Sequence, residues 1–328
     1  MAASIPLFGA PKKFFKPIMT FQQLEYIVAV DKSRHFVNAA TQCGVTQSTL
    51  STTIAKLEQE IDVIIFDRSK HPIEPTPMGK KIIQQAEVIL HNSAQLREMV
   101  ESERDEERGK LLIGMIPSVA PLLFPKLSQF VQQENPSMEA HLYEKMPLDL
   151  IEELQRSAID MAIISNNDVT DTNLLTIDLW QERFVVYASR NNRLFGQENI
   201  RIEDLRDGQM WTLRSFHDRY PQLTEVTHQP SLYHNSLDCG SLQTLLQTVE
   251  VSAGYTLIPE TFALCLPQEY QAGIARINTG KFFRTVTLAI RKDYMRERML
   301  NIVTGAVKRI IPRELLVARI ANFDRVKI

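Results

Sequence analysis

The chain has 328 residues, of which 44% are hydrophobic and 23% are charged, so it is long enough for two or three domains and too long for a single core. Its 37 basic and 39 acidic residues nearly cancel. The overall charge therefore does not indicate nucleic acid as a partner, and any DNA-binding function has to rest on local pattern.

The three cysteines, Cys43, Cys239 and Cys265, lie far apart and form no CxxC pair. This usage favours a reducing compartment over a disulfide-built secreted domain, so we expect a cytoplasmic protein. No apolar run approaches the roughly 18 residues that a membrane span needs, and we expect no membrane partner.

Residues 1–18 form an N-terminal tail. They include Lys12, Lys13 and Lys16 but lack the apolar core and cleavage pattern of a signal peptide. We interpret them as a loose, disordered tail ahead of an original start at Met19. A basic arm that contacts DNA phosphates is the alternative.

Three short helices are predicted within residues 19–76. Apolar residues recur at helical spacing in residues 21–31, 35–42 and 47–60. Thr20 and Thr46 are placed to cap the first and third helices, and Gly44 fits the left-handed position that ends the second. The tight glycine turn between the second and third helices predicts a helix-turn-helix.

A wing and a long helix are predicted next. Residues 64–68 are extended, and residues 70–76 contain the two prolines expected of a rigid hairpin loop. Thr76 and Pro77 fit the cap and first position of a linker helix over residues 77–108, whose charged end, residues 101–108, is a solvated hinge. Steps of four and three in this helix predict a coiled-coil dimerisation seam of Ile82, Ala86, Ile89, Ser93, Leu96 and Val100.

From Lys110 onward, strands alternate with helices. The strands are predicted at residues 111–116, 140–144, 161–164, 184–188, 210–213, 255–258 and 286–290, and the helices at residues 119–133, 148–156, 241–251 and 297–310. This alternation predicts an α/β domain with a largely parallel sheet.

Many fixed offsets over about sixty residues resemble the signature of LysR-type transcription regulators. The residues that carry it are Phe36-Val37-Asn38-Ala39-Ala40, Val45-Thr46-Gln47-Ser48-Thr49-Leu50-Ser51, Ile54, Leu57-Glu58, Ile65-Phe66-Asp67-Arg68 and Thr76-Pro77-Met78-Gly79. The resemblance covers residues 19–312 and leaves a C-terminal extension, residues 313–328, without an assignment.

The resemblance implies a multidomain α and α/β fold. A winged helix-turn-helix occupies residues 19–76, a linker helix residues 77–108, and a two-lobed, periplasmic-binding-protein-like effector domain residues 109–312. Lobe I is expected at residues 109–182 and 286–312, and lobe II at residues 183–285.

The resemblance also implies that the third helix enters the major groove of double-stranded DNA. Gln47 is the best candidate for a base contact, because its carboxamide can both donate to and accept from adenine. Short hydrogen-bonding side chains accompany it at the start of the helix: Ser48, Thr49, Ser51 and Thr52. The candidates for phosphate contacts are Arg34, Lys56, Arg68 and Lys70, with His71 beside them in the wing.

Two positions depart from the family pattern, which often has proline at Ser48 and glycine at Asp62. In addition, residues 19–76 hold five Lys or Arg against seven Asp or Glu, a net charge of 5 − 7 = −2, although a DNA-binding domain is expected to be basic. Dimerisation and the basic tail are the candidate compensations. The alternative for this region is a small helical core whose polar residues merely face solvent.

The family's sensor binds a small molecule in a cleft between its lobes. Ile116, Pro117 and Ser118 follow the first predicted strand and open a helix, and Ser165 and Asn166 end the third strand. Helix N-termini favour anions, so these residues are candidates for the cleft. The alternative is that Ser118 and Ser165 simply cap helices.

Residues 114–121 and 254–259 resemble the peroxide-sensing OxyR branch of the family. In that branch the reactive cysteine directly follows a histidine, whereas Asp218 follows His217 here. A carboxylate forms neither a sulfenic acid nor a disulfide, so the peroxide mechanism is not transferred. The further candidates for binding a polar effector are Thr212, His217, Asp218, Tyr233 and Asn235.

Two other candidate sites each have a simpler interpretation. A redox switch between Cys239 and Cys265 competes with two buried thiols. A zinc site built from His217, His228, His234 and Cys239 fits no ligand spacing, and no metal or cofactor is expected.

The sequence therefore predicts a DNA-binding LysR-type regulator, a homodimer or homotetramer that senses an unknown small effector and has RNA polymerase as a further partner. One alternative is an OxyR-like oxidative-stress regulator with a non-standard sensing mechanism, and another is an effector-independent DNA-binding factor. An enzyme is not expected, because the sequence has no Gly-rich phosphate loop, nucleophile elbow or metal pair.

Overall fold

The computed structural model describes residues 19–102, 109–169, 173–205, 209–215, 220, 235–278, 282–294 and 296–322. The chain divides into two compact units, Met1–Leu96 and Arg97–Ile328, and each is described by itself. Within the described residues, no helix is both long and apolar enough to cross a membrane. The domain boundaries expected from the sequence remain predictions.

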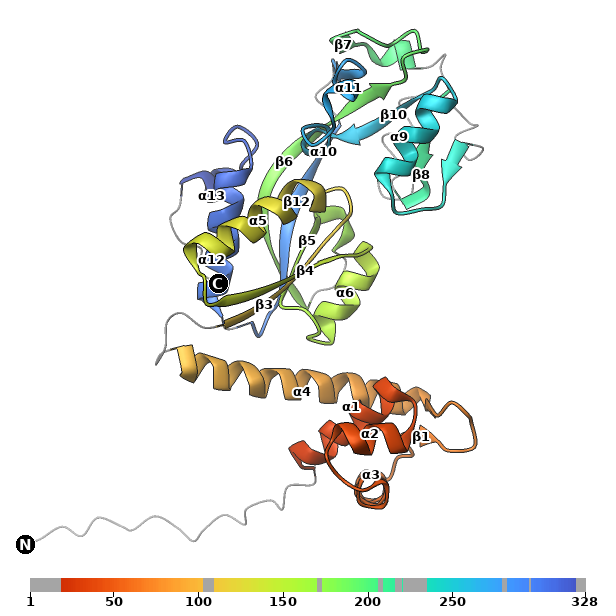
Figure 1. Ribbon diagram of the computed structural model, residues 1–328, viewed down its shortest axis with the longest axis vertical. Coiled ribbons are helices and arrows are strands. Elements are labelled where there is room, and N and C mark those ends of the chain that lie inside the picture. Colours follow the sequence, from red (N-terminus) through yellow and green to blue (C-terminus); the bar gives the residue numbers. More distant parts are fainter. Residues whose placement is uncertain are drawn as a thin grey trace, which may run out of the picture. The chain divides into compact units, whose positions relative to one another are not determined.

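The first unit contains the predicted helices and wing (Figure 1). Its elements are α1 (Phe21–Ser33), α2 (Phe36–Gln42), α3 (Gln47–Ile61), β1 (Phe66–Asp67), β2 (Glu74–Pro75) and the start of α4 (Pro77–Ser102). β1 and β2 pair antiparallel as the wing. The core contains Ile27, Val30, Leu50, Ile54 and Leu57, all fully buried. The apolar periodicity of the three helices therefore folds them into one small core.

The predicted caps of this unit are confirmed. The hydroxyl oxygen of Thr20 accepts from the backbone N–H of Gln23 at 3.3 Å, and that of Thr46 accepts from the N–H of Thr49 at 3.2 Å. Gly44 has φ +67°, the left-handed conformation expected after α2. The starts of α1 and α3 and the end of α2 are therefore set by residues within a few positions of each helix end.

The predicted seam of α4 begins inside this unit. Ala86 is only 1% exposed and packs in the helix-turn-helix core with Ile83, while Ile82 is partly buried against the same core. Ile82 and Ala86 therefore are not available to pair with a second copy of α4, because the first turns of α4 complete the core of this unit. Farther along, Ile89 and Leu96 are 37% and 53% exposed.

The second unit is an α/β structure built around one sheet (Figure 1). Its strands are β3 (Gly109–Met115), β4 (Met138–Glu144), β5 (Met161–Ser165), β6 (Leu174–Ala188), β7 (Asn199–Ile200), β10 (Tyr255–Pro259), β11 (Ile274–Ile277) and β12 (Phe283–Arg291), with β8 (Thr212–Leu213) and β9 (Ser236–Leu237) paired separately. Its helices are α5 (Ala120–Glu134), α6 (Pro147–Gln155), η1 (Asn166–Asp168), η2 (Ile202–Leu205), α9 (Leu242–Val251), α10 (Glu260–Ala263), α11 (Gln268–Gln271), α12 (Glu297–Ile310) and α13 (Ala318–Asn322).

The prediction of a largely parallel sheet is wrong. The strand order is β4-β3-β5-β12-β6-β11-β7, with β10 also paired to β6. β3 pairs parallel with β4 and β5, but β12 runs antiparallel between β5 and β6. β6 then pairs antiparallel with β10 and β11. The sheet is mixed because β12 returns from near the end of the chain to lie beside β6.

β6 connects two lobes. We call lobe I the part with β3–β5, β12, α5, α6, α12 and α13, and lobe II the part with β7–β11 and α9–α11. In lobe II, alternate residues of β6 enter two separate cores: Phe184 and Val186 face one, and Val185 and Tyr187 face the other. β6 therefore runs through the hinge between the lobes, and the start of β12 pairs with it there as a second hinge strand.

The predicted strand at residues 184–188 is only the last third of β6, which begins at Leu174. Polar residues in its first part, among them Asp178 and Glu182, conceal the strand in the sequence. Each has a specific partner in the fold, and the hydroxyl of Thr287 donates to the Asp178 carboxylate at 2.8 Å. Similarly, the predicted strand at residues 210–213 shrinks to β8, and Met210 forms only an isolated bridge to Tyr255.

The C-terminal extension, which the family pattern left unassigned, packs on lobe I. Leu316 forms an antiparallel bridge with Trp180 of β6. The N–H of Gln181 donates to the Leu315 carbonyl at 2.8 Å, and the N–H of Val317 donates to the Leu179 carbonyl at 3.1 Å. The described part of this extension therefore adds an edge contact to the strand that crosses the hinge.

Candidate DNA interface and effector cleft

α3 presents a polar face opposite its buried one. Gln47, Ser48, Thr49 and Thr52 are exposed and Ser51 is half-buried. The hydroxyls of Ser48 and Thr49 each lie 2.9 Å from the Thr46 hydroxyl. The first turn of α3 thus carries an ordered group of donors and acceptors of the kind that reads base edges.

Each cation predicted to contact phosphate has a carboxylate partner in the same unit. The pairs are Arg34 with Asp31 (3.0 Å), Lys56 with Glu60 (3.9 Å), Arg68 with Glu58 (3.1 Å) and Lys70 with Glu74 (2.5 Å). His71 is exposed in the wing. All four cations are themselves exposed, so a DNA phosphate can compete with the carboxylates for them.

A narrow pocket lies between the lobes of the second unit. Its volume is about 30 Å³, and it is lined by Ile116, Pro117, Ser118, Met146, Pro147, Asp168, Leu213, Ser215, Tyr220, Gly240, Leu242 and Arg284. An adjoining pocket of about 290 Å³ shares Pro117, Met146, Gly240 and Leu242 with it. We call these the inner and outer pockets of the cleft. The predicted residues Ile116, Pro117 and Ser118 therefore do line the cleft.

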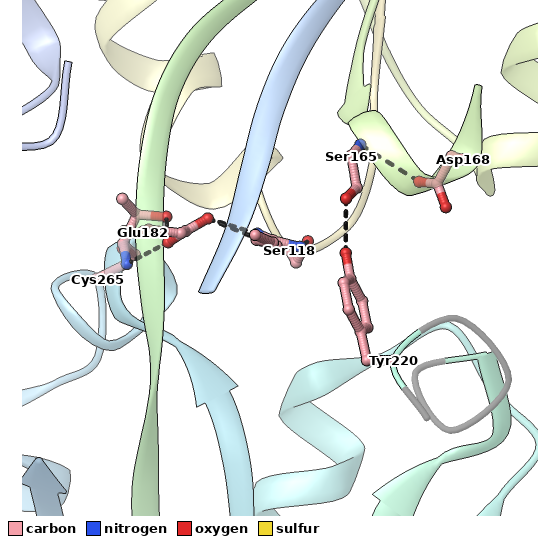
Figure 2. Close-up of polar contacts among 8 residues, drawn as sticks. Ser118, Ser165, Asp168, Glu182, Tyr220 and Cys265 are labelled. Carbon is pink, nitrogen blue, oxygen red and sulfur yellow. Dashed lines mark hydrogen bonds and ion pairs between the residues drawn. The ribbon is translucent and has the colours of Figure 1, made fainter. Parts of the chain in front are cut away.

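A hydrogen bond joins the two lobes beside the inner pocket (Figure 2). The Tyr220 hydroxyl of lobe II donates to the Ser165 hydroxyl of lobe I at 2.6 Å, and all of Ser165 is buried. The backbone N–H of Ser165 donates to the Asp168 carboxylate at 3.3 Å. Ser165 thus caps the short η1 turn and also contacts the other lobe.

A buried ion pair forms a second polar connection (Figure 2). Arg284 of β12 lies 2.8 Å from the Glu182 carboxylate of β6, and its guanidinium also donates to the Ser118 hydroxyl at 2.8 Å. The other carboxylate oxygen of Glu182 accepts from the backbone N–H and hydroxyl of Thr261 at 2.8 and 2.6 Å. This pair links the loop after β3 to both hinge strands and to lobe II.

The interpretation of Ser118 as a helix cap is wrong. α5 begins after Val119, which makes no side-chain cap bond, and the Ser118 hydroxyl is instead held by Arg284. The reason is that a buried guanidinium needs acceptors, and the loop after β3 supplies one at short range.

The other candidates for the effector site fall in different places. Asn166 is exposed on η1, and Thr212 is buried with its hydroxyl donating to the Leu213 carbonyl at 3.3 Å. Asn235 is half-buried directly before β9, and none of these described residues lines the inner pocket. His217, Asp218 and Tyr233 lie outside the described residues, as do the three histidines of the zinc alternative.

Sequence reasoning missed Glu182, Arg284 and Tyr220. The sequence offers little signal for the first two, because Glu182 lies between Gln181 and Arg183, and Arg284 between Phe283 and Thr285. Charged side chains are almost never fully buried without a partner, but only the fold shows that these two residues pair.

The thiols near the cleft are not paired. Cys239 and Cys265 are both free. Burial raises the pKa of the Cys265 thiol, and its sulfur contacts the Thr261 carbonyl at 3.6 Å. A raised pKa keeps this thiol protonated and therefore weakly reactive.

Comparison with known proteins identifies both units. Residues 21–80 match the model of the bacterial regulatory helix-turn-helix proteins of the lysR family, and residues 104–304 match the LysR substrate binding domain. The chain belongs to the LysR family. It is a DNA-binding transcription regulator with an effector-binding domain, and LysR regulators bind DNA and form oligomers.

Several relatives of this LysR-type regulator are activators of hydrogen peroxide-inducible genes. It is 30% identical over 247 residues to the hydrogen peroxide-inducible genes activator of Haemophilus influenzae, covering 75% of this chain and 82% of that protein. It is 29% identical over 252 residues to the transcriptional dual regulator OxyR of Escherichia coli K12, covering 76% and 81%. The resemblance to the OxyR branch is thereby confirmed.

A solved structure supports the same assignment. The full-length OxyR of Pseudomonas aeruginosa with a cysteine-to-aspartate substitution matches with a TM-score of 0.76 and 27% identity, covering 92% of this chain and 98% of that one. The predicted combination of a helix-turn-helix and an α/β effector domain is confirmed.

Proposed function

We propose that this LysR-type regulator reads its operator with the first turn of α3 and alters transcription when a small molecule binds in the cleft. It acts in the cytoplasm as a homodimer or homotetramer, with RNA polymerase as a further partner, and catalyses no reaction. The contact that supports cleft sensing most directly is the buried one between Ser118 and Arg284, because it ties a wall of the inner pocket to the hinge.

The volumes of the two pockets limit the size of each part of the effector. An inner pocket of about 30 Å³ admits a group the size of one or two waters. The outer pocket of about 290 Å³ is wide enough for a larger apolar body. The effector is therefore a small molecule with a hydrogen-bonding end that reaches Ser118 and an apolar part that stays in the outer pocket.

Binding at this position would shift the balance between hinge conformations. The pocket is lined by Ser118 of lobe I and by Tyr220 and Leu242 of lobe II. A ligand that contacts both lobes binds most tightly at the hinge angle at which both contacts form. The shift in the populations of the hinge conformations is limited by how much more tightly the ligand binds one conformation than the other.

This regulator does not sense peroxide through a thiol. Asp218 follows His217 where the OxyR branch has its reactive cysteine, and burial raises the pKa of Cys265. We expect the DNA footprint upstream of the protein's own gene to be the same before and after peroxide. A peroxide-dependent footprint that reverses with reductant would instead support the OxyR-like alternative and would point to Cys239 or Cys265.

The DNA-reading role of α3 is tested by a matched pair of glutamines. Gln47→Ala should weaken operator binding by about 1–3 kcal/mol at fixed salt and relax the preference at one base pair. Gln59→Ala, an exposed change farther along the same helix, should leave operator affinity unchanged. Equal effects of the two substitutions would remove Gln47 from the interface.

The sensing role is tested with Ser118→Ala. A panel of small polar metabolites is screened for compounds that raise the unfolding temperature of the full chain. A compound that stabilises the parent protein and alters its footprint should do neither to the variant. If no compound shifts the parent protein, the effector-independent alternative is favoured.

A further inference from the structure

A groove of about 570 Å³ lies beside the strand that crosses the hinge, and it shares no lining residue with the inner or outer pocket of the cleft. We call it the hinge groove. It is bounded by residues 181–185 of β6, by residues 314–317 of the C-terminal extension, and by residues of β11, α10 and the start of β12. This volume lies within the range of about 300–1,000 Å³ that is usual for small-molecule sites.

Besides Glu182, which is buried and paired with Arg284, four charged side chains line the hinge groove: Arg183, Arg276, Glu260 and Glu314. Within the part of the chain that the structure describes, none of the four side chains forms an ion pair or hydrogen bond with a protein group. Elsewhere in this unit, opposite charges that lie close together do pair, as in Arg201 with Asp204. The groove therefore offers guanidinium and carboxylate groups that are both available to a ligand.

Apart from Gln181 and Glu182, the remaining residues that line the groove are apolar. Phe282 and Phe283 contribute to it, and Phe283 is 47% exposed although it stands at the start of a central strand. An occupant that satisfies the whole lining therefore carries a negative group, a positive group and an apolar side chain. Free amino acids with apolar side chains and short apolar peptides have this combination.

The groove is placed so that its occupant would affect the hinge. Glu314 belongs to the extension that pairs with β6 in lobe I, and Arg276 lies on β11 in lobe II. Glu182 also lines the groove, and its partner Arg284 lines the inner pocket of the cleft. A ligand that joins Glu314 to Arg276 would hold the two lobes at a place that shares no lining residue with the cleft.

We propose that the hinge groove is a second ligand site that binds a zwitterionic apolar peptide or amino acid. The arginines hold its carboxylate and the glutamates hold its ammonium group. This site is separate from the effector site in the cleft, and its occupancy stabilises one arrangement of the lobes.

The test is calorimetric titration of the full chain with the dipeptide leucylphenylalanine. We expect saturable binding, and binding at least about tenfold weaker for the N-acetylated and the C-amidated dipeptide, each of which lacks one charge. Arg276→Gln and Glu314→Gln should weaken binding of the free dipeptide to a similar extent. Arg298→Gln, an exposed change on α12 outside the groove, is the matched control and should have no effect.

Ser118→Ala distinguishes this site from the proposed function, since Ser118 lines the cleft and does not line the hinge groove. Loss of dipeptide binding in Ser118→Ala but not in Arg276→Gln would assign the peptide to the cleft and overturn the proposal. No binding by the parent protein at millimolar dipeptide, or equal affinity for the blocked dipeptides, would also overturn it. Unfolding temperatures of all variants confirm that they are folded, and Arg183→Gln is the replacement for any that is not.

Discussion

Arg284→Met should destabilise the effector-binding unit strongly. Arg284 and Glu182 are 2% and 1% exposed, and the guanidinium also holds the Ser118 hydroxyl. Methionine fills much of the same space, but it leaves Glu182 as a buried carboxylate with only the two donors of Thr261. Breaking one side of a buried pair in this way costs about 3–5 kcal/mol.

Urea denaturation followed by tryptophan fluorescence measures this loss in the full chain. The chain has two tryptophans, Trp180 and Trp211, and both belong to the second unit, so the signal reports that unit alone. We expect a lower midpoint for Arg284→Met with little change in the slope.

Two controls determine whether the buried charge is the cause. The double variant Glu182→Leu with Arg284→Met should recover most of the lost stability, because no unpaired charge remains. Arg201→Met breaks the exposed pair with Asp204 and should lower the midpoint far less than Arg284→Met does. The reasoning is refuted if Arg284→Met costs as little as Arg201→Met, or if the double variant is less stable than the single one.

Three further changes test local features. Asp62 ends α3 with φ +53°, so Asp62→Gly should stabilise the first unit by about 1 kcal/mol in thermal melts followed by circular dichroism. Asp62→Ala, which removes the charge but keeps the side-chain strain, should gain less. A Cβ on Gly79 would lie 2.0 Å from the Ile65 carbonyl oxygen, so Gly79→Ala should lower the melting temperature of the first unit. As the control, Gly305→Ala should not destabilise the second unit, because its Cβ would meet no described atom within 4 Å beyond the adjacent residues and the backbone of α12. Leu316→Ala removes a side chain that is 9% exposed in the lobe I core and should cost about 2 kcal/mol in the fluorescence assay; a neutral result would show that the C-terminal extension does not support the hinge.

The sequence alone determined the first unit of this regulator almost completely. Its helices are set by apolar spacing, by the threonine caps at Thr20 and Thr46 and by the left-handed glycine at Gly44, and all of these signals act within a few residues. The polar first turn of α3 follows from the same pattern. Local interactions of this kind can be recognised without knowing what packs where.

Only the tertiary structure determined which residues connect the two lobes of the effector-binding unit. The Glu182–Arg284 contact spans 102 positions in sequence, and the Ser118–Arg284 contact spans 166. The hinge strand β6 was missed in its first part because its polar residues break the apolar pattern, and its partners come from β12 and α10. A buried charged side chain requires a partner of opposite charge. Only the fold brings that partner within 3 Å, because separation along the chain does not determine which strands become neighbours.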